Sequence, residues 1–277
     1  MTKTILVTGS NGQLGKTFLT IYKDLYQIYS FPRSSLDISN KDEVKKILDL
    51  NPDIIVNCAA MTDVDSCEIN EQKAFEINTY SILNFSKYRG HFFQISTDYI
   101  FDGRNGPYYE NDPVNPLNIY GESKLKGENI VKDIFKKYTI LRSNIIFGNH
   151  SRASFLRWVV ESLKSNQKIK VVDDQFNNPV SVIDCSNVIS FLINEEKYGT
   201  YHLGSDLICS RFEFANLIAN YWDLDCSLIS KISTEELSRN LKSYRARRPL
   251  KSGLVSNYDF MPKLSLKGSI EALKESS

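Results

Sequence analysis

The N-terminal run from Thr4 to Gly15, TILVTGSNGQLG, constrains the fold of this chain more than any other segment. The side chains of Thr4–Thr8 are apolar or β-branched, which favours a strand, and helical spacing begins after residue 12. Glycines recur at positions 9, 12 and 15. A strand that leads through a glycine-rich turn directly into a helix is typical of the first unit of a doubly wound parallel sheet.

Each glycine of this loop has a separate steric role in such a unit. Gly9 permits the tight turn, Gly12 lets the backbone approach a pyrophosphate, and Gly15 lets the helix pack closely on the strand. The helix N-terminus then faces the phosphates. We therefore expect Gly9, Gly12 and Gly15 to bind a dinucleotide, the alternative being a glycine-rich turn without a ligand.

Four further apolar runs, at 27–31, 54–59, 91–96 and 138–146, follow the first strand. Helical spacing connects them at 13–23, 41–50, 71–89 and 120–137. Strands that are apolar along their whole length are typical of parallel sheets buried on both faces. The pattern predicts an α/β fold, a Rossmann-type doubly wound parallel sheet.

After about residue 148 the predicted elements become shorter and the loops longer. We expect helices near 154–165, 183–194 and 211–222, and strands at 169–172 and 200–203. We assign residues 1–148 to a dinucleotide-binding Rossmann domain. Residues 149–277 are assigned mainly to a smaller substrate-binding lobe, some of whose elements could return to the main sheet.

Charge and cysteine content narrow the function classes. The chain has 34 Lys and Arg against 33 Asp and Glu, a net charge of +1, which favours neither a nucleic-acid surface nor an anionic membrane as partner. No signal-peptide pattern opens the chain and no apolar run approaches about 18 residues, so we expect a soluble, cytoplasmic protein. The five cysteines are scattered along the chain, which favours reduced thiols. The three histidines are far apart in the sequence, so no metal site is predicted.

The turn after the second predicted strand bears on the choice of dinucleotide. It lacks the acidic residue that usually binds the ribose 2′-hydroxyl of NAD, and Arg33 stands where a 2′-phosphate needs a cation. NADPH is therefore favoured, with NADH as the alternative, unless Arg33 is only a solvated charge of the turn. Asp37 and Ile38 would then flank the adenine.

Tyr120 and Lys124 lie four residues apart on a predicted helix, so their side chains project from one face. A neighbouring ammonium lowers the pKa of a phenol, and Tyr120 could then give a proton to a carbonyl oxygen. Thr97 follows a predicted strand at the sheet edge where α/β folds bind ligands, and its hydroxyl could polarise the same carbonyl. Asp98 is the expected substrate contact beside it, and the alternative is an ordinary amphipathic helix.

Several segments resemble the extended short-chain dehydrogenase/reductase family, and within it the dTDP-4-dehydrorhamnose reductase group. The resemblance extends over nearly the whole chain. The segments that carry it are TGSNGQLG (8–15), IIVNCAAMTDVD (54–65), ISTDYIFDG (95–103), NPLNIYGESKLKGE (115–128) and DDQFNNP (173–179).

This resemblance implies reduction of the C4 ketone of a nucleotide-activated 4-keto-6-deoxy sugar for a cell-surface polysaccharide. The substrate that it favours is dTDP-4-dehydro-L-rhamnose, with dTDP-L-rhamnose as the product. Hydride would come from the nicotinamide and the proton from Tyr120, with Thr97 and Asp98 on the substrate side. The cofactor positions that the resemblance implies are Gly12, Gln13, Leu14, Asp37, Ile38, Ala59, Ala60, Met61, Tyr120 and Lys124.

The chain departs from this group at three positions. The group often has a sugar-contacting tryptophan where this chain has Ile145, and Asn177 replaces a glycine in the DDQFNNP segment. Some members hold a magnesium ion with glutamates, one of which lies on the helix after the glycine loop. Thr17 occupies that position in this chain, so no such site is predicted. The first two differences bear on recognition of the sugar and not on the chemistry.

The basic segment YRARRP, at 244–249, could recognise an anion locally. Planar guanidinium groups suit the diphosphate of a sugar nucleotide, and Arg247 and Arg248 are the candidates. A solvated basic loop is the alternative.

Two other functions stay open from the sequence, as does the association of two chains. Sugar-nucleotide epimerases and dehydratases of the same superfamily retain NAD and regenerate it within the reaction. The resemblance also extends to the non-catalytic subunit of methionine adenosyltransferase, although the Thr97, Tyr120 and Lys124 set favours an enzyme.

Overall fold

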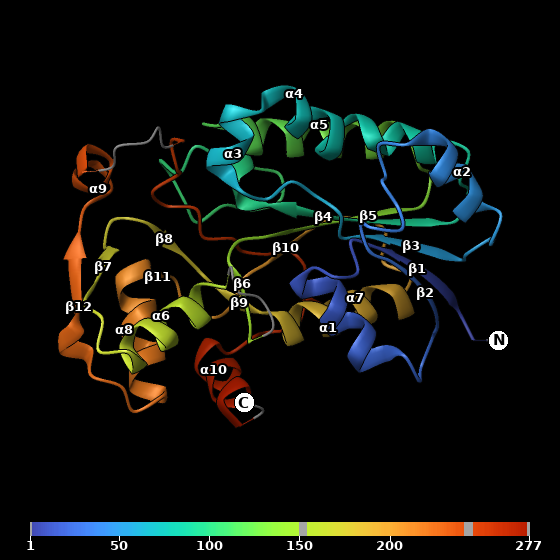
Figure 1. Cartoon of the computed structure of the whole chain (residues 1–277). Helices are drawn as coiled ribbons and strands as arrows, with labels where there is room; N and C mark the ends of the chain where they lie inside the picture. The colour runs from blue at the N-terminus through green and yellow to red at the C-terminus, as the bar shows by residue number, and fades with distance from the viewer. Residues whose placement is uncertain (1, 150–153, 241–245, 276–277) are drawn as a thin grey trace.

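The computed structural model describes residues 2–149, 154–240 and 246–275, and its centre is a six-stranded parallel sheet (Figure 1). The sheet has the order β10-β5-β4-β3-β1-β2. Its strands are β1 (Thr4–Thr8), β2 (Gln27–Phe31), β3 (Ile54–Asn57), β4 (His91–Thr97), β5 (Tyr138–Ser143) and β10 (Gly199–Leu203). This order confirms the predicted α/β, Rossmann-type fold, and β10 joins it from the second half of the chain.

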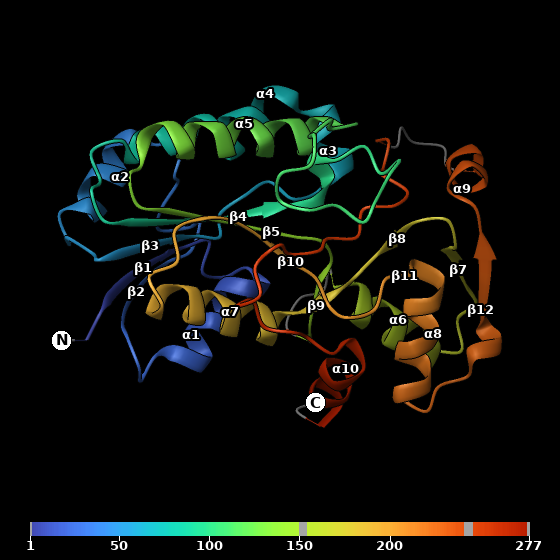
Figure 2. The same cartoon turned by 180° about the vertical axis from the view of Figure 1, so that it is seen from behind.

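Helices cover both faces of the sheet (Figures 1 and 2). Helices α1 (Gln13–Tyr22) and α7 (Val182–Asn194) lie on one face; α2 (Lys41–Leu48), α3 (Val64–Ile69), α4 (Glu71–Asn78) and α5 (Ile119–Ile134) lie on the other. Side chains of β1 alternate between the two cores: Ile5 and Val7 pack with Phe18, whereas Leu6 packs with Val44. Burying each such side chain contributes roughly 1.5–3 kcal/mol.

A second group of elements packs beyond one end of the sheet, around its own apolar core (Figure 1). Phe147, Leu156, Phe214, Ile218 and Leu266 are buried there. The helices are α6 (Phe155–Lys164), α8 (Arg211–Tyr221), α9 (Thr234–Asn240) and α10 (Leu266–Glu275). The strand pairs are β7 (Ile169–Val172) with β12 (Ile229–Ile232), β8 (Phe176–Asn177) with β11 (Cys209–Ser210), and β6 (Ile146–Phe147) with β9 (Val180–Ser181).

Two predicted elements are divided in the structure. The expected strand 138–146 ends at Ser143, because Ile146 and Phe147 form β6 and pair with β9 outside the main sheet. The expected helix 71–89 ends at Asn78 and continues as the 3₁₀ helix Tyr80–Phe85. Between these helices Thr79 donates its hydroxyl hydrogen to the Ser123 carbonyl of α5, which ties the break to a neighbouring helix.

The segment 250–255 joins the two groups of elements through its backbone. Lys251 N donates to Gly103 O at 3.0 Å, and Ser252 N donates to Phe176 O of β8 at 2.9 Å. Further along, Gly253 O accepts from Tyr108 N at 2.8 Å. The segment therefore lies between the 103–108 loop, which follows β4, and β8.

Within the described ranges no helix is long and apolar enough to cross a membrane. The same residues contain no group of three His, Cys, Asp or Glu side chains that could hold a metal ion. All five cysteines are free thiols. The absence of a metal site stays a prediction, as does the division of the chain at residue 148.

Candidate active site

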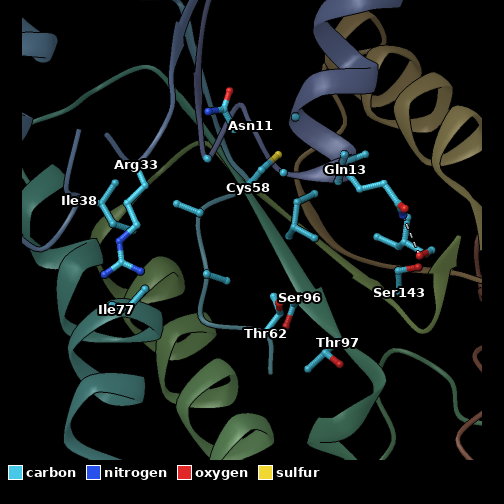
Figure 3. A pocket seen from close by; sticks show the side chains of 18 of the residues that line it. Asn11, Gln13, Arg33, Ile38, Cys58, Thr62, Ile77, Ser96, Thr97 and Ser143 are labelled. Atoms are coloured by element: carbon cyan, nitrogen blue, oxygen red, sulfur yellow. Dashed lines mark hydrogen bonds between the residues drawn. The ribbon is translucent and has the colours of Figure 1, made fainter. Parts of the chain in front are cut away.

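A pocket of about 520 Å³ opens at the carboxyl ends of β1, β3 and β4 (Figure 3). Strand β1 lies between β2 and β3, and the helices that follow β1 and β3 lie on opposite faces of the sheet. Ligands of open α/β sheets bind in such a crevice, where the strand order reverses. The pocket extends from Arg33 at one end to Gln13 and Ser143 at the other.

The glycine loop forms the wall of this pocket next to β1. Gly9 has φ +62°, and a Cβ on it would lie 2.8 Å from the backbone of Ala59. A Cβ on Gly15 would lie 2.8 Å from Gly9 O and from Ser10 Cα. All five predicted loop residues, Gly9, Gly12, Gln13, Leu14 and Gly15, line the pocket. The N-terminus of α1, which follows Gly12, is therefore next to the pocket.

Arg33, Asp37, Ile38, Ala59 and Ala60, all predicted as cofactor-binding residues, line this pocket. The Arg33 side chain passes Ile38 and extends toward Ile77 of α4 (Figure 3). Asp37 accepts a hydrogen bond from Ser39 N at 2.9 Å, which fixes the turn.

Met61, predicted beside Ala59 and Ala60, does not line the pocket. Its N–H donates to the Asn78 side chain at 2.8 Å, and its carbonyl accepts from the same amide at 3.0 Å. Two hydrogen bonds therefore hold the Met61 backbone at the C-terminal end of α4.

Thr97 and Tyr120 line the other part of the pocket. Thr97 is the last residue of β4, and Tyr120 lies in the first turn of α5, where the Asn118 side chain caps the helix by accepting from Gly121 N at 2.8 Å. A Cβ on Gly121 would lie 2.1 Å from Tyr99 O. This glycine therefore lets α5 approach the turn that follows Thr97, a role that the sequence analysis missed.

Lys124 is buried one helical turn after Tyr120 and does not itself line the pocket. Its ammonium donates to Ile95 O of β4 at 2.6 Å. Burial lowers the pKa of Lys124 to about 8, while the nearby Glu128 carboxylate acts to raise it.

Burial raises the pKa of Tyr120, and the Thr97 hydroxyl acts in the opposite direction. Lys124 was expected to lower the pKa of Tyr120. Without a bound cofactor the pKa of Tyr120 is instead raised, because desolvation of the phenol is the larger effect. At neutral pH the phenol keeps its proton.

A buried ion pair supports the strand that carries Thr97. The guanidinium of Arg142 on β5 binds both carboxylate oxygens of Glu128 on α5, and Ser96 donates to the same carboxylate at 2.5 Å. Burial acts to raise the pKa of Glu128, but Arg142 and Ser96 together lower it below its usual value. Sequence reasoning missed this cluster, although Arg142 in an apolar strand was a signal that a buried partner exists.

His202 of β10 extends this cluster. Arg142 Nη1 lies 3.2 Å from His202 Nε2, and His202 Nδ1 lies 3.0 Å from Tyr108 O. Because arginine can only donate, Nε2 accepts and Nδ1 carries the hydrogen. Burial and the Arg142 charge lower the pKa of His202 to about 4, so the ring is neutral at pH 7.

Asp98, predicted as a substrate contact, is buried and does not line the pocket. The Thr97 hydroxyl donates to its Oδ1 at 3.2 Å and the Ser252 hydroxyl to its Oδ2 at 2.5 Å. Burial raises the pKa of Asp98 to about 6, and both hydroxyls and the charge of Arg211 oppose this rise.

The two candidate arginines of the C-terminal region also lie outside the pocket. Arg248 binds the Asp65 carboxylate with both terminal nitrogens, at 3.0 and 2.8 Å. The Arg247 side chain is exposed, and its carbonyl accepts from Asn118, the cap of the helix that carries Tyr120. The backbone of Arg247 therefore lies close to the start of α5.

The three departures from the group are placed as follows. Ile145 packs partly buried against the core of the second group of elements, and Asn177 lies in β8 opposite Cys209. Thr17 is buried in α1.

Comparisons with known proteins identify the family. The model of the RmlD substrate binding domain matches residues 2–262. The spore coat polysaccharide biosynthesis protein SpsK of Bacillus subtilis is 34% identical over 243 residues, 85% of this chain and 84% of the relative. A dTDP-4-dehydrorhamnose reductase of Aggregatibacter actinomycetemcomitans is 32% identical over 225 residues, 76% of each chain.

A solved structure extends the similarity to the whole fold. The dTDP-4-dehydrorhamnose reductase of Bacillus anthracis, in complex with NADP, superposes with a TM-score of 0.93 at 33% identity and covers 100% of both chains. The chain therefore belongs to the RmlD substrate binding domain family and, within the extended short-chain dehydrogenases/reductases, to the dTDP-4-dehydrorhamnose reductase group.

Proposed function

We propose that this protein reduces the C4 ketone of a nucleotide-activated 4-keto-6-deoxy sugar at the expense of NADPH. The observation that carries the proposal is that Thr97 and Tyr120 line the same pocket as the glycine loop. The named relatives favour dTDP-4-dehydro-L-rhamnose as substrate and dTDP-L-rhamnose as product. The similarity to SpsK favours polysaccharide synthesis as the purpose.

The pocket fits a nicotinamide dinucleotide. A loop without side chains at Gly9 and Gly12 leads into α1, so backbone N–H groups at the start of α1 can bind a pyrophosphate. Ile38, Ala59 and Ala60 would hold the adenine, and Arg33 would bind the 2′-phosphate of NADPH. When bound, the nicotinamide supplies a hydride.

In this proposal Tyr120 is the acid of the reaction. As C4 gains a hydride, its oxygen gains charge and takes the phenolic proton of Tyr120, leaving the hydroxyl of the product. A buried phenol that is protonated at neutral pH suits this role. Thr97 donates its one hydroxyl hydrogen to Asp98, so it would position the substrate as a hydrogen-bond acceptor. The buried Lys124 would stabilise the phenolate after proton transfer and hold the nicotinamide ribose.

For the remaining substrate contacts, Arg247 is the better candidate for the diphosphate, because its side chain is exposed and its backbone carbonyl lies at the start of α5. Arg248 would first have to give up its ion pair with Asp65. Asp98 would act on the sugar through Thr97, as argued below. The cytoplasmic location and the homodimer also remain proposals.

The test is incubation of the purified protein with NADPH and a panel of dTDP-linked 4-keto-6-deoxy sugars. We expect loss of reduced-nicotinamide absorbance in proportion to the alcohol formed. Absence of any oxidation across the panel would refute the proposal. Copurified NAD with turnover and no net oxidation would instead indicate an epimerase or dehydratase, and a stoichiometric enzyme partner without reductase activity would indicate a regulatory subunit.

A further inference from the structure

The Asp98 carboxylate is held between two hydroxyl groups that come from distant parts of the chain. Thr97 donates to Oδ1 and Ser252 donates to Oδ2, at 3.2 and 2.5 Å. Asp98 is 2% exposed and Ser252 is 1% exposed. Of these three residues only Thr97 lines the pocket, so Ser252 can act on a bound substrate only through Asp98, which reaches the pocket by its hydrogen bond with Thr97 and by its charge on Tyr120.

We propose that Ser252 is a positioning residue for the reaction, because its hydrogen bond fixes the Asp98 carboxylate, which in turn orients the Thr97 hydroxyl in the pocket. This inference rests on the proposed reductase function. It assigns a role at the catalytic end to the C-terminal segment 250–255.

The backbone of this segment holds Ser252 in place independently of its hydroxyl group. Ser252 N donates to Phe176 O, Lys251 N to Gly103 O and Leu254 N to the Asn178 side chain, all within 3.0 Å. Removing the hydroxyl therefore leaves the main-chain bonds that position the segment. The Ser252 hydroxyl itself donates its hydrogen bond to Asp98.

The charge state of Asp98 decides what Thr97 can do. Only an ionised carboxylate accepts hydrogens from both hydroxyls, whereas a protonated one must use a hydrogen of its own as a donor. The charged and titratable groups that act on Asp98 are Arg211 of α8, which favours the carboxylate, and Tyr120 of α5. The hydrogen bond that orients Thr97 should therefore weaken as the pH falls below about 6, the pKa of Asp98, because a neutral carboxyl group is a poorer acceptor than a carboxylate.

The experiment compares Ser252→Ala with Ser256→Ala, a matched control. Ser256 donates to a different carboxylate, Glu110, at 2.7 Å and lies four residues further along. Asp98 is titrated by carbon-13 NMR of its carboxyl group, assigned with Asp98→Asn, and kcat and KM are measured against pH with the keto sugar.

In Ser252→Ala we expect the Asp98 midpoint to rise by about one pH unit, because a hydrogen bond to a charged group is lost. The acid limb of kcat should move up by the same interval, so kcat should fall roughly tenfold at pH 5 and about twofold at pH 7. KM for NADPH should not change. Ser252→Cys, a weaker donor of similar shape, should fall between wild type and Ser252→Ala.

Three results would overturn the inference: an unmoved Asp98 midpoint in Ser252→Ala, an equal shift in Ser256→Ala, or a further tenfold loss when Ser252→Ala is added to Asp98→Asn. The NMR titration needs no substrate, so it separates two kinds of failure. A wild-type protein that reduces no keto sugar refutes the proposed function, whereas an unmoved midpoint in an active enzyme refutes only the role of Ser252.

Discussion

The two ends of the pocket are built in different ways. The adenosine and pyrophosphate end consists of the turns that follow β1, β2 and β3, and glycines and alanines line it in the turns after β1 and β3. The catalytic end combines Thr97 of β4 with Tyr120 of α5, and buried side-chain hydrogen bonds support it from β5, β10 and the segment 250–255. The first end should therefore be sensitive to added atoms, and the second to lost polar partners.

The supporting bonds of the catalytic end also explain why so many polar groups are tolerated in its interior. Leaving one buried charge without its partner costs several kcal/mol. Arg142 forms an ion pair with Glu128, and the Lys124 ammonium donates a hydrogen bond to the Ile95 carbonyl. Each of these bonds also fixes β4 or α5, so the same contacts that keep the charges paired place Thr97 and Tyr120.

Tyr120→Phe should give the largest difference between an effect on catalysis and an effect on cofactor binding. It removes the proposed acid and leaves the glycine loop unchanged, so kcat should fall by roughly 10²- to 10⁴-fold while the Kd for NADPH stays the same. Steady-state kinetics and fluorescence titration of NADPH measure the two quantities. Tyr80→Phe, which removes an exposed phenol from the 3₁₀ helix that follows α4, is the control.

Near-normal turnover in Tyr120→Phe would remove Tyr120 from the mechanism. Equal losses of turnover and NADPH affinity would show that the two ends are not independent. The comparison with Tyr80→Phe excludes a general effect of losing a tyrosine hydroxyl.

Gly15→Ala should affect the opposite end. The new methyl group would lie 2.8 Å from Gly9 O and Ser10 Cα, so the loop must shift away from α1. We expect NADPH affinity to fall roughly 10- to 100-fold and stability to fall by about 1–3 kcal/mol, with kcat at saturating NADPH less affected. Gly268→Ala in α10 is the matched control, because its nearest neighbours would be 3.6 Å away.

Binding titrations and urea unfolding test this prediction. Unchanged NADPH affinity in Gly15→Ala would mean that the loop is not the pyrophosphate site. A similar loss in Gly268→Ala would mean that any added methyl group weakens the fold.

Elements that depend on local sequence could be predicted, whereas elements that depend on partners far along the chain could not. The bounds of β1, β2 and β7 match the predicted runs, because the strand preferences of apolar, β-branched and aromatic residues leave a local pattern. Helix α3, helix α10 and the two-residue strands were not predicted. Such short elements are stabilised by partners far along the chain, as in the pairing of β6 with β9.

The candidate site shows the same division. The glycine loop, Arg33 and the turn residues 59 and 60 were found from short motifs, and the structure brings them together with Thr97 and Tyr120. The Glu128–Arg142 pair and Ser252 were missed, because their partners are 14 and 154 residues away and no spacing rule connects them. Burial of Asp98 and the ion pair of Arg248 could not be anticipated for the same reason.

Arg33 is the exception at the adenosine end, because its proposed role depends on a charged side chain, and Arg33→Ala should have the smallest effect. Arg33 is exposed, so its attraction to a 2′-phosphate is weakened by solvent and salt. We expect the ratio of kcat/KM for NADPH over NADH to fall roughly tenfold at low salt, and less at high salt.

Arg33→Lys tests whether charge alone suffices, since lysine keeps the charge but loses the planar fork. We expect it to retain part of the preference for NADPH, and KM for NADH should be the same in all three proteins. An equal loss with both nucleotides would mean that Arg33 shapes the adenine site through its contact region near Ile38 and Ile77 instead of binding a phosphate. The adenosine end would then depend on packing alone, and its difference from the catalytic end would be complete.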